Sequence, residues 1–137
     1  MDEARLRALP LFESLAKKDL QQVAQYADEV DLGEGTEFIT EGAFAYEFFV
    51  IETGSAEVRR DGERIAELGP GDFLGEMGIL GQEVRNASVM ATSPVRAIVM
   101  LSRDFRQLDR SFPEVAHQIR AAAERRAESL AARMPSS

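Results

Sequence analysis

The chain has 137 residues, 45% hydrophobic and 29% charged, which is typical of one globular domain spanning residues 1–137. Its net charge of −8 argues against a general nucleic-acid surface, because binding to polyphosphate needs a basic face. The lack of cysteine excludes a disulfide framework and a thiolate zinc site, and no apolar run approaches the roughly 18 residues of a membrane span. With no signal-like N-terminus, the composition favours a cytoplasmic protein.

Helical patterns open the chain and are expected over about residues 3–29. A short helix is predicted from about Glu3 to Leu9, ended by Pro10. A second helical pattern runs from Ser14 to Val30. Its apolar residues recur close to helical spacing, at Leu15, Leu20, Val23, Ala24 and Ala27.

The pattern changes over residues 30–101, where all ten glycines lie. Between the glycines are short apolar runs, namely "EFIT", "YEFFVIETG", "AEVRR", "ERIAELG", "ASVMAT" and "VRAIVML". Such runs, separated by glycine turns, are typical of antiparallel strands, and the plainest hairpin has Asp61-Gly62 at its tip. Many short, evenly spaced strands predict a sandwich or barrel, a jelly roll among them.

Two more helices are expected over about residues 102–134, which contain no glycine. The first is predicted to be capped by Ser102, and the second begins at Pro113 and runs to Met134. The second carries a thin apolar stripe, so part of it is expected to dock on the barrel. The stripe consists of Val115, Ile119, Ala122, Ala123 and Leu130. The predicted fold class is mainly β with flanking helices.

Catalysis finds no support in the residue types. A metal centre needs several converging ligands, whereas the only histidine, His117, falls on the last predicted helix. A Ser-His-acid triad would also need His117, and the chain has no GxSxG elbow. We therefore expect a non-enzymatic protein without a metal or cofactor, and a surface or packing role for His117.

The stretch "FLGEMGILGQEVRNAS", from Phe73 to Ser88, contains a candidate anion site. Glycines bracket residues 76–80, and a single helical turn there would offer unpaired backbone N–H groups to an anion. Arg85 presents a planar fork suited to phosphate, and Glu76 is an acceptor suited to a sugar hydroxyl. Together these groups describe a nucleoside monophosphate. The spacing alone instead favours a salt bridge between Glu76 and Arg85.

Two longer segments, "GAFAYEFFVIETGSAEV" and "ELGPGDFLGEMGILGQEVRNASV", closely resemble the cyclic-nucleotide-binding domain. This family includes protein kinase A regulatory subunits, bacterial catabolite activator proteins and cyclic-nucleotide-gated channels. Its phosphate-binding cassette is matched here by Gly75, Glu76, Gly78, Ile79, Leu80, Arg85, Ala87 and Ser88. The resemblance extends from about Leu11 to Arg126 and implies an eight-stranded jelly-roll barrel flanked by helices.

The resemblance also implies roles for individual residues. Glu76, with the Gly75 N–H, would bind the ribose 2′-hydroxyl, and Arg85 would bind the exocyclic phosphate oxygens. The cradle would be completed by the N–H groups of Gly78 and Asn86, with Met77 and Ala87 lining it.

The chain departs from the family pattern at three places. Val84 replaces a frequent proline, and Asn86 stands where threonine tends to accompany cGMP, so this position does not decide the base. Bacterial activators contact adenine through a polar pair on the last helix. This chain has Leu130 and Ala131 in that register, so Leu130 would cover the base through apolar contact.

The implied function is a sensor of a cyclic nucleotide, with cAMP favoured over cGMP. Its C-terminal helices would move as a lid and signal to an output protein or domain that this sequence does not include. We expect no direct contact with nucleic acid or membrane. Family analogy favours a homodimer through the last helix, whereas arginines at 120, 125, 126 and 133 favour a solvated face. The alternative function is a degenerate member that acts as an interaction module without binding nucleotide.

Overall fold

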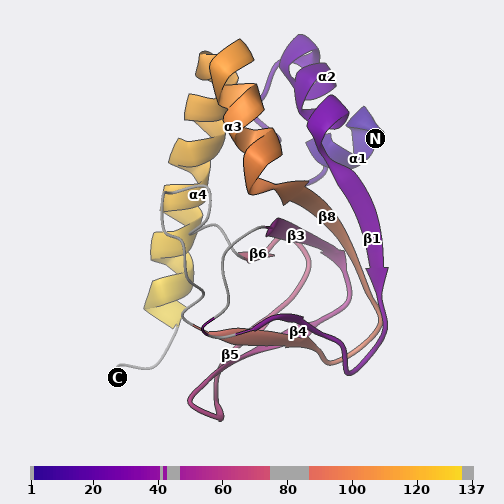
Figure 1. Ribbon diagram of the computed structural model, residues 1–137, viewed down its shortest axis with the longest axis vertical. Coiled ribbons are helices and arrows are strands. Elements are labelled where there is room, and N and C mark those ends of the chain that lie inside the picture. Colours follow the sequence, from indigo (N-terminus) through magenta and orange to yellow (C-terminus); the bar gives the residue numbers. More distant parts are fainter. Residues whose placement is uncertain (1, 41, 43–46, 75–86, 134–137) are drawn as a thin grey trace.

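The computed structural model of the chain describes residues 2–40, 42, 47–74 and 87–133, with side chains as far as residue 125. Helix α1 (Glu3–Arg7) opens the fold, as expected, and ends before Leu9. Its cap is Asp2, whose carboxylate accepts a 2.9 Å hydrogen bond from the Ala4 N–H. Figure 1 shows α1 beside the end of α2 and next to the barrel.

Helix α2 (Lys17–Tyr26) is shorter than its sequence pattern, and the prediction that the pattern continues to Val30 is wrong. Strand β1 (Asp28–Leu32) takes up those residues instead and pairs antiparallel with β8 (Val95–Leu101). The pairing satisfies the backbone of β1 and turns Val30 and Leu32 toward the barrel interior. Tertiary pairing thus overrides a short helical continuation.

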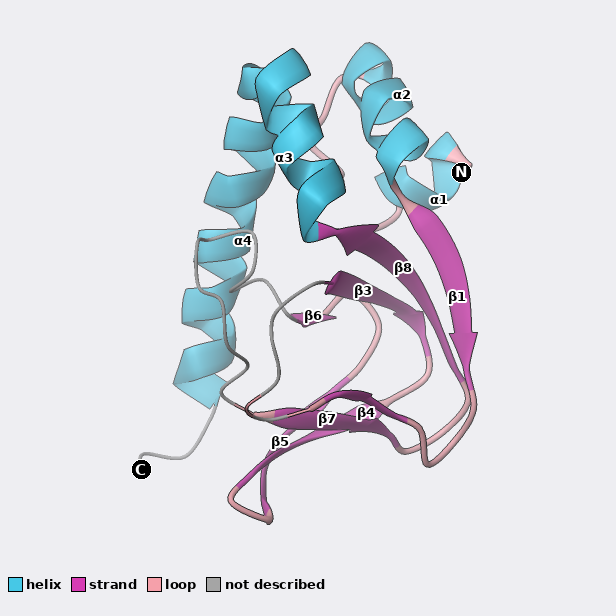
Figure 2. Cartoon of the chain, in the orientation of Figure 1, coloured by secondary structure: helices cyan, strands magenta, loops and turns pink. Residues whose placement is uncertain are grey.

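The strands form two four-stranded antiparallel sheets, in the orders β1-β8-β3-β6 and β2-β7-β4-β5 (Figure 2). The remaining strands are β2 (Glu37–Ile39), β3 (Glu47–Thr53), β4 (Ala56–Arg60), β5 (Glu63–Leu68), β6 (Phe73–Leu74) and β7 (Ser88–Ala91). The predicted class, mainly β with flanking helices, is confirmed, and so is each strand expected from the apolar runs. Strands β1 and β6 were not among those runs.

The Asp61-Gly62 hairpin is also confirmed. Strands β4 and β5 pair up to Arg60↔Glu63, which leaves only these two residues in the loop. Both have positive φ, 53° for Asp61 and 80° for Gly62. This is the geometry that a tight two-residue hairpin requires and that an Asp-Gly pair adopts readily.

Strand β3 is buried on both faces. Phe48 and Val50 belong to an apolar cluster shared with the helices, whereas Phe49 and Ile51 belong to the cluster inside the barrel. Successive side chains of a strand point to opposite faces, so a strand covered on both sides reads as a continuous apolar run. The run "FFVI" is that sequence, and β3 thereby joins the two clusters.

The C-terminal helices are α3 (Ser102–Ser111) and α4 (Pro113–Arg133). The expectation that Ser102 caps α3 is wrong. Leu101 occupies the cap position without a side-chain hydrogen bond, and Ser102 is the first helical residue and is buried. The last residue of β8 therefore leads directly into the helix, and Ser102 is its first residue rather than its cap.

Helix α4 docks through the predicted stripe as far as its side chains are described, which leaves out Leu130. The buried residues are Val115, Ala116, Ile119, Ala122 and Ala123, all in the cluster between the helices and the β3 sheet. His117 is exposed on the same helix. Over the described residues, no helix is long and apolar enough to cross a bilayer.

Candidate functional site

The predicted cassette connects the two sheets. It follows β6, which pairs with β3 through Phe49↔Leu74, and precedes β7, which pairs with β4 through Arg59↔Ser88. Both flanking ends are therefore fixed by strand pairing in different sheets. Six of the predicted site residues lie outside the described part of the chain: Gly75, Glu76, Met77, Gly78, Arg85 and Asn86.

Ser88, the last residue of the cassette motif, is described as the first residue of β7, and Ala87 is the one residue predicted to line the ligand that the structure describes. It is 8% exposed and belongs to the cluster inside the barrel. Its methyl group therefore packs in the barrel core immediately before β7 begins. A small side chain at this point allows the chain to pass close to the barrel wall as it enters the strand.

The strand before the cassette touches both apolar clusters. Phe73 packs in the apolar cluster shared by β3 and the helices, which we call the helix-side cluster. Its ring lies 5.8 Å from that of Phe48. Leu74, the next residue, packs inside the barrel. A displacement of β6 would therefore disturb side-chain packing inside the barrel and against the helices at the same time.

Helices α3 and α4 are held together by a polar contact as well as by burial. The Arg120 guanidinium lies over the Phe105 ring, 5.3 Å from its centre. Arg120 also pairs with Asp109, with 3.3 Å between Nη2 and Oδ2. Between the helices, the Phe112 N–H donates to the Leu108 carbonyl at 2.7 Å, which closes the end of α3.

The backbone of Leu130, the residue predicted to cover the base, lies on α4, but its side chain is outside the described part.

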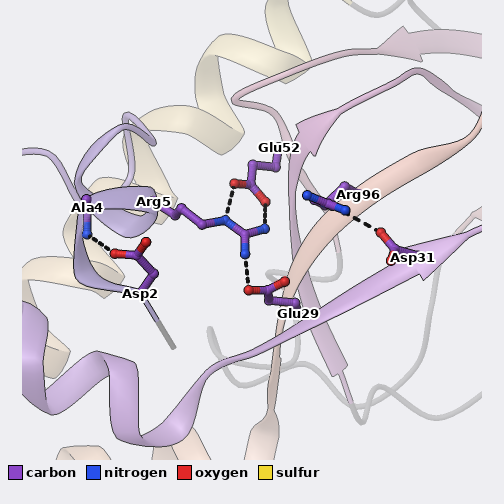
Figure 3. A network of polar contacts seen from close by, with 7 residues as sticks. All are labelled: Asp2, Ala4, Arg5, Glu29, Asp31, Glu52 and Arg96. Carbon is purple, nitrogen blue, oxygen red and sulfur yellow. Dashed lines mark hydrogen bonds and ion pairs between the residues drawn. The ribbon is translucent and has the colours of Figure 1, made fainter.

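Sequence reasoning missed a polar network that joins α1 to the barrel (Figure 3). Arg5 of α1 donates through Nε to Glu52 of β3 at 2.7 Å, and it also pairs with Glu29 of β1. The hydrogen bond with Glu52 raises the pKa of the Arg5 guanidinium above its usual value. No local signal could have revealed these partners, because Arg5 and Glu52 are 47 residues apart in sequence.

A surface pocket of about 400 Å³ lies where β1, β3 and β8 meet. Its rim carries the ion pair between Arg96 and Asp31, with 3.2 Å between Nε and Oδ1 (Figure 3). Ala87, the predicted site residue that the structure describes, does not line it. The lining consists of Asp31, Leu32, Gly33, Thr53, Pro94, Val95 and Arg96. Among the described residues, no three His, Cys, Asp or Glu side chains converge as metal ligands.

Comparison with known proteins identifies the family. The model of the cyclic nucleotide-binding domain matches residues 29–111. The cAMP-dependent protein kinase regulatory subunit of Schizosaccharomyces pombe is 31% identical over 107 residues, which cover 77% of this chain and 26% of the subunit. A cGMP-dependent protein kinase of Drosophila melanogaster is 29% identical over 121 residues, covering 82% of this chain and 13% of the kinase. The chain thus spans about a quarter or less of these relatives' lengths.

The fold has a close structural counterpart. A crystal structure from Geobacter metallireducens aligns with a TM-score of 0.86, covering 94% of this chain and 97% of the other. At 19% identity it shows the fold alone. The sequence match extends from β1 to the end of α3 and includes the whole predicted cassette. The chain belongs to the cyclic nucleotide-binding domain family.

Proposed function

We propose that this chain is a regulatory sensor that binds a cyclic nucleotide, cAMP in preference to cGMP, at residues 75–87. The observation that carries the proposal is the family match over residues 29–111, which encloses a cassette with Glu76 and Arg85 both intact. A carboxylate acceptor and a guanidinium donor suit the two ends of one ligand, a ribose hydroxyl and a phosphate. The function is regulatory rather than catalytic.

Within the proposed site, Glu76 and the Gly75 N–H bind the ribose 2′-hydroxyl, and Arg85 binds the phosphate. The N–H groups of Gly78 and Asn86 complete the cradle. Met77 and Ala87 line it. The burial of Ala87 in the barrel core is consistent with this arrangement, since it brings the end of the cassette against the barrel wall.

The signal would leave through the C-terminal helices. Phe73, beside the cassette, shares one apolar cluster with Leu108 of α3 and Ile119 of α4, so it is the described residue best placed to couple the site to the helices. A ligand shifts the helix positions only by its differential affinity for the two states. Leu130 would cover the base when α4 is in its closed position.

The preference for cAMP rests on the S. pombe relative, which is named for cAMP. Asn86 does not decide the base. The Drosophila relative is named for cGMP, so both nucleotides belong in the test. The output that receives the signal would be a partner or a further domain, as suggested by the greater length of both relatives. We place the protein in the cytoplasm, as a homodimer through α4.

Isothermal titration of the purified chain with cAMP and with cGMP tests the proposal. We expect micromolar or tighter binding of cAMP, weaker binding of cGMP, and loss of binding in Arg85→Ala, because that change removes the charged phosphate ligand. Arg7→Ala is the matched control, since Arg7 is exposed on α1 and remote in sequence from the cassette. Absence of heat with both nucleotides would instead support an interaction module that retains the fold without binding.

A further inference from the structure

Helix α3 presents a row of three arginines to solvent. Arg103, Arg106 and Arg110 are all exposed and recur at the spacing of one helix face. At the pitch of an α-helix they lie within an arc of about 60° and along about 10 Å of the axis. Phe105 and Leu108, on the opposite side, are buried in the helix-side cluster. We call these three residues the α3 arginine row.

The row has few partners within the chain. Among the residues that the structure describes, neither Arg103 nor Arg106 has an ion pair or hydrogen bond, and Arg110 donates only to the neutral Gln107, at 2.8 Å. Among the described residues, Arg7 and Arg125 also lack a carboxylate partner, but five other arginines have one. Those paired with carboxylates are Arg5, Arg59, Arg64, Arg96 and Arg120.

The acids nearest in sequence do not neutralise the row. Asp109 already pairs with Arg120 of α4. Asp104 is half-buried and lies about 100° around the helix from Arg103. The guanidinium donors of the row are therefore directed to solvent.

The row gives its own helix little net stabilisation. Arg110 lies in the last turn, where the helix dipole favours a positive charge, but Arg103 lies in the first turn, where the dipole disfavours one. Arg106 and Arg110 are also one turn apart and repel each other. Solubility does not need the row either, because the chain already carries a net charge of −8, which three arginines only reduce. Neither folding nor solubility accounts for it.

We propose that the α3 arginine row binds an acidic segment of a partner protein. Guanidinium groups bind carboxylates through two parallel hydrogen bonds, which makes arginine well suited to this recognition. A length of about 10 Å matches acidic side chains on two turns of a helix or on alternate residues of a strand. Nucleic acid is disfavoured because three cations along about 10 Å offer few phosphate contacts, whereas binding to polyphosphate needs a broader basic face. The α3 arginine row requires no bound nucleotide, so binding of the acidic segment does not depend on cyclic-nucleotide sensing.

Fluorescence anisotropy with a labelled peptide of alternating glutamate and alanine tests this binding, at low ionic strength and without cyclic nucleotide. We expect the triple variant Arg103→Gln/Arg106→Gln/Arg110→Gln to bind at least about tenfold more weakly than the wild type. The matched control, Lys17→Gln/Lys18→Gln/Arg125→Gln, removes the same charge from exposed positions on α2 and α4 and should retain binding. Circular dichroism verifies that both variants fold.

Three outcomes would overturn the proposal. The first is no measurable binding of the acidic peptide to the wild type, and the second is an equal loss in the two triple variants, which would indicate a general charge effect. The third is tighter binding of oligothymidylate, or of phosphatidylcholine vesicles containing phosphatidylserine, than of the peptide. A peptide with glutamine in place of glutamate should show no binding.

Discussion

Gly54 holds the closest backbone approach among the described glycines. It lies between β3 and β4 with φ of 96°, and a Cβ built on it would stand 2.2 Å from the Pro94 carbonyl oxygen. The adjacent Ser55 N–H donates to the Ser93 hydroxyl at 3.0 Å, and the Thr92 N–H donates to the Ser55 carbonyl at 3.0 Å. The turn between β3 and β4 is thus fastened to the turn between β7 and β8, so these residues join the two sheets.

Gly54→Ala should be much more destabilising than Gly35→Ala. Both glycines have positive φ, which costs an alanine about 1–2 kcal/mol. Nothing lies within 4 Å of a Cβ at Gly35, whereas a Cβ at Gly54 meets backbone that cannot easily move, adding about 1–3 kcal/mol. Urea unfolding measures both free energies. Equal losses for the two variants would show that the turn relaxes freely.

For individual residues, the sequence indicated where turns occur but not which glycine is indispensable. The glycines between the apolar runs were interpreted as turn residues, and Gly35, Gly54 and Gly62 all have positive φ. Only the packing of distant turns distinguishes Gly54 from the others. The cassette residues illustrate the same limit, because their identities come from a family motif. Their roles remain predictions, including that of Ala87, of which only the burial is described.

Among the elements, α3 and α4 are joined by a contact that the sequence pattern did not reveal. Their apolar faces were predictable from helical periodicity, and Phe105 and Ile119 are indeed buried. Arg120, in contrast, was assigned to a solvated face. It is instead half-buried over the Phe105 ring and paired with Asp109. Long cationic side chains often cover apolar surface in this way, which residue type alone does not indicate.

A double-mutant cycle measures the pairing of the two C-terminal helices. Arg120→Met keeps the aliphatic stem, and Phe105→Leu keeps an apolar side chain in the core. We expect a coupling of about 0.5–1 kcal/mol in the free energy of unfolding, which is the usual range for a partly exposed cation–π pair. The ion pair with Asp109 cancels in the cycle, since it is lost whether or not Phe105 is present. The exposed Arg125→Met, combined with Phe105→Leu, should show no coupling.

The strand elements show where sequence periodicity succeeds and where it fails. The Asp61-Gly62 hairpin was predictable, because its turn chemistry is local. Strand β1 was not, because its backbone partner is β8, more than 60 residues away in the register Asp28↔Val99. Strand β6 has only Phe73 and Leu74, too few residues for alternation to be visible. Non-local pairing therefore accounts for the omission of β1, and short length accounts for the omission of β6.

For the whole molecule, the two apolar clusters are coupled through one sheet. Phe48 and Val50 face the helices, and Phe49 and Ile51 face the barrel interior, so β3 cannot separate from one cluster without disturbing the other. The sequence predicted a barrel and a docked helix separately. It could not show that they share a sheet, because a continuous apolar run looks the same whatever covers its second face.

This shared sheet predicts that the chain unfolds as one cooperative unit. Leu108 of α3 and Leu68 of β5 are both fully buried, one in each cluster. We expect Leu108→Ala and Leu68→Ala each to lower the free energy of unfolding by about 2–5 kcal/mol. Each variant should shift one transition, observed equally by helical circular dichroism and by hydrogen exchange of the amides in β4 and β7.

Independent clusters would behave differently. Leu108→Ala would then lower the helical transition while amide exchange in β4 and β7 stayed at wild-type rates, and Leu68→Ala would produce the reverse. The exposed Gln118→Ala on α4 serves as the control, since it should leave both probes unchanged to within about 0.5 kcal/mol. Cooperative behaviour is also what the proposed signalling requires. Only a helix pair that shares its stability with the barrel can transmit a change in the cassette through Phe73.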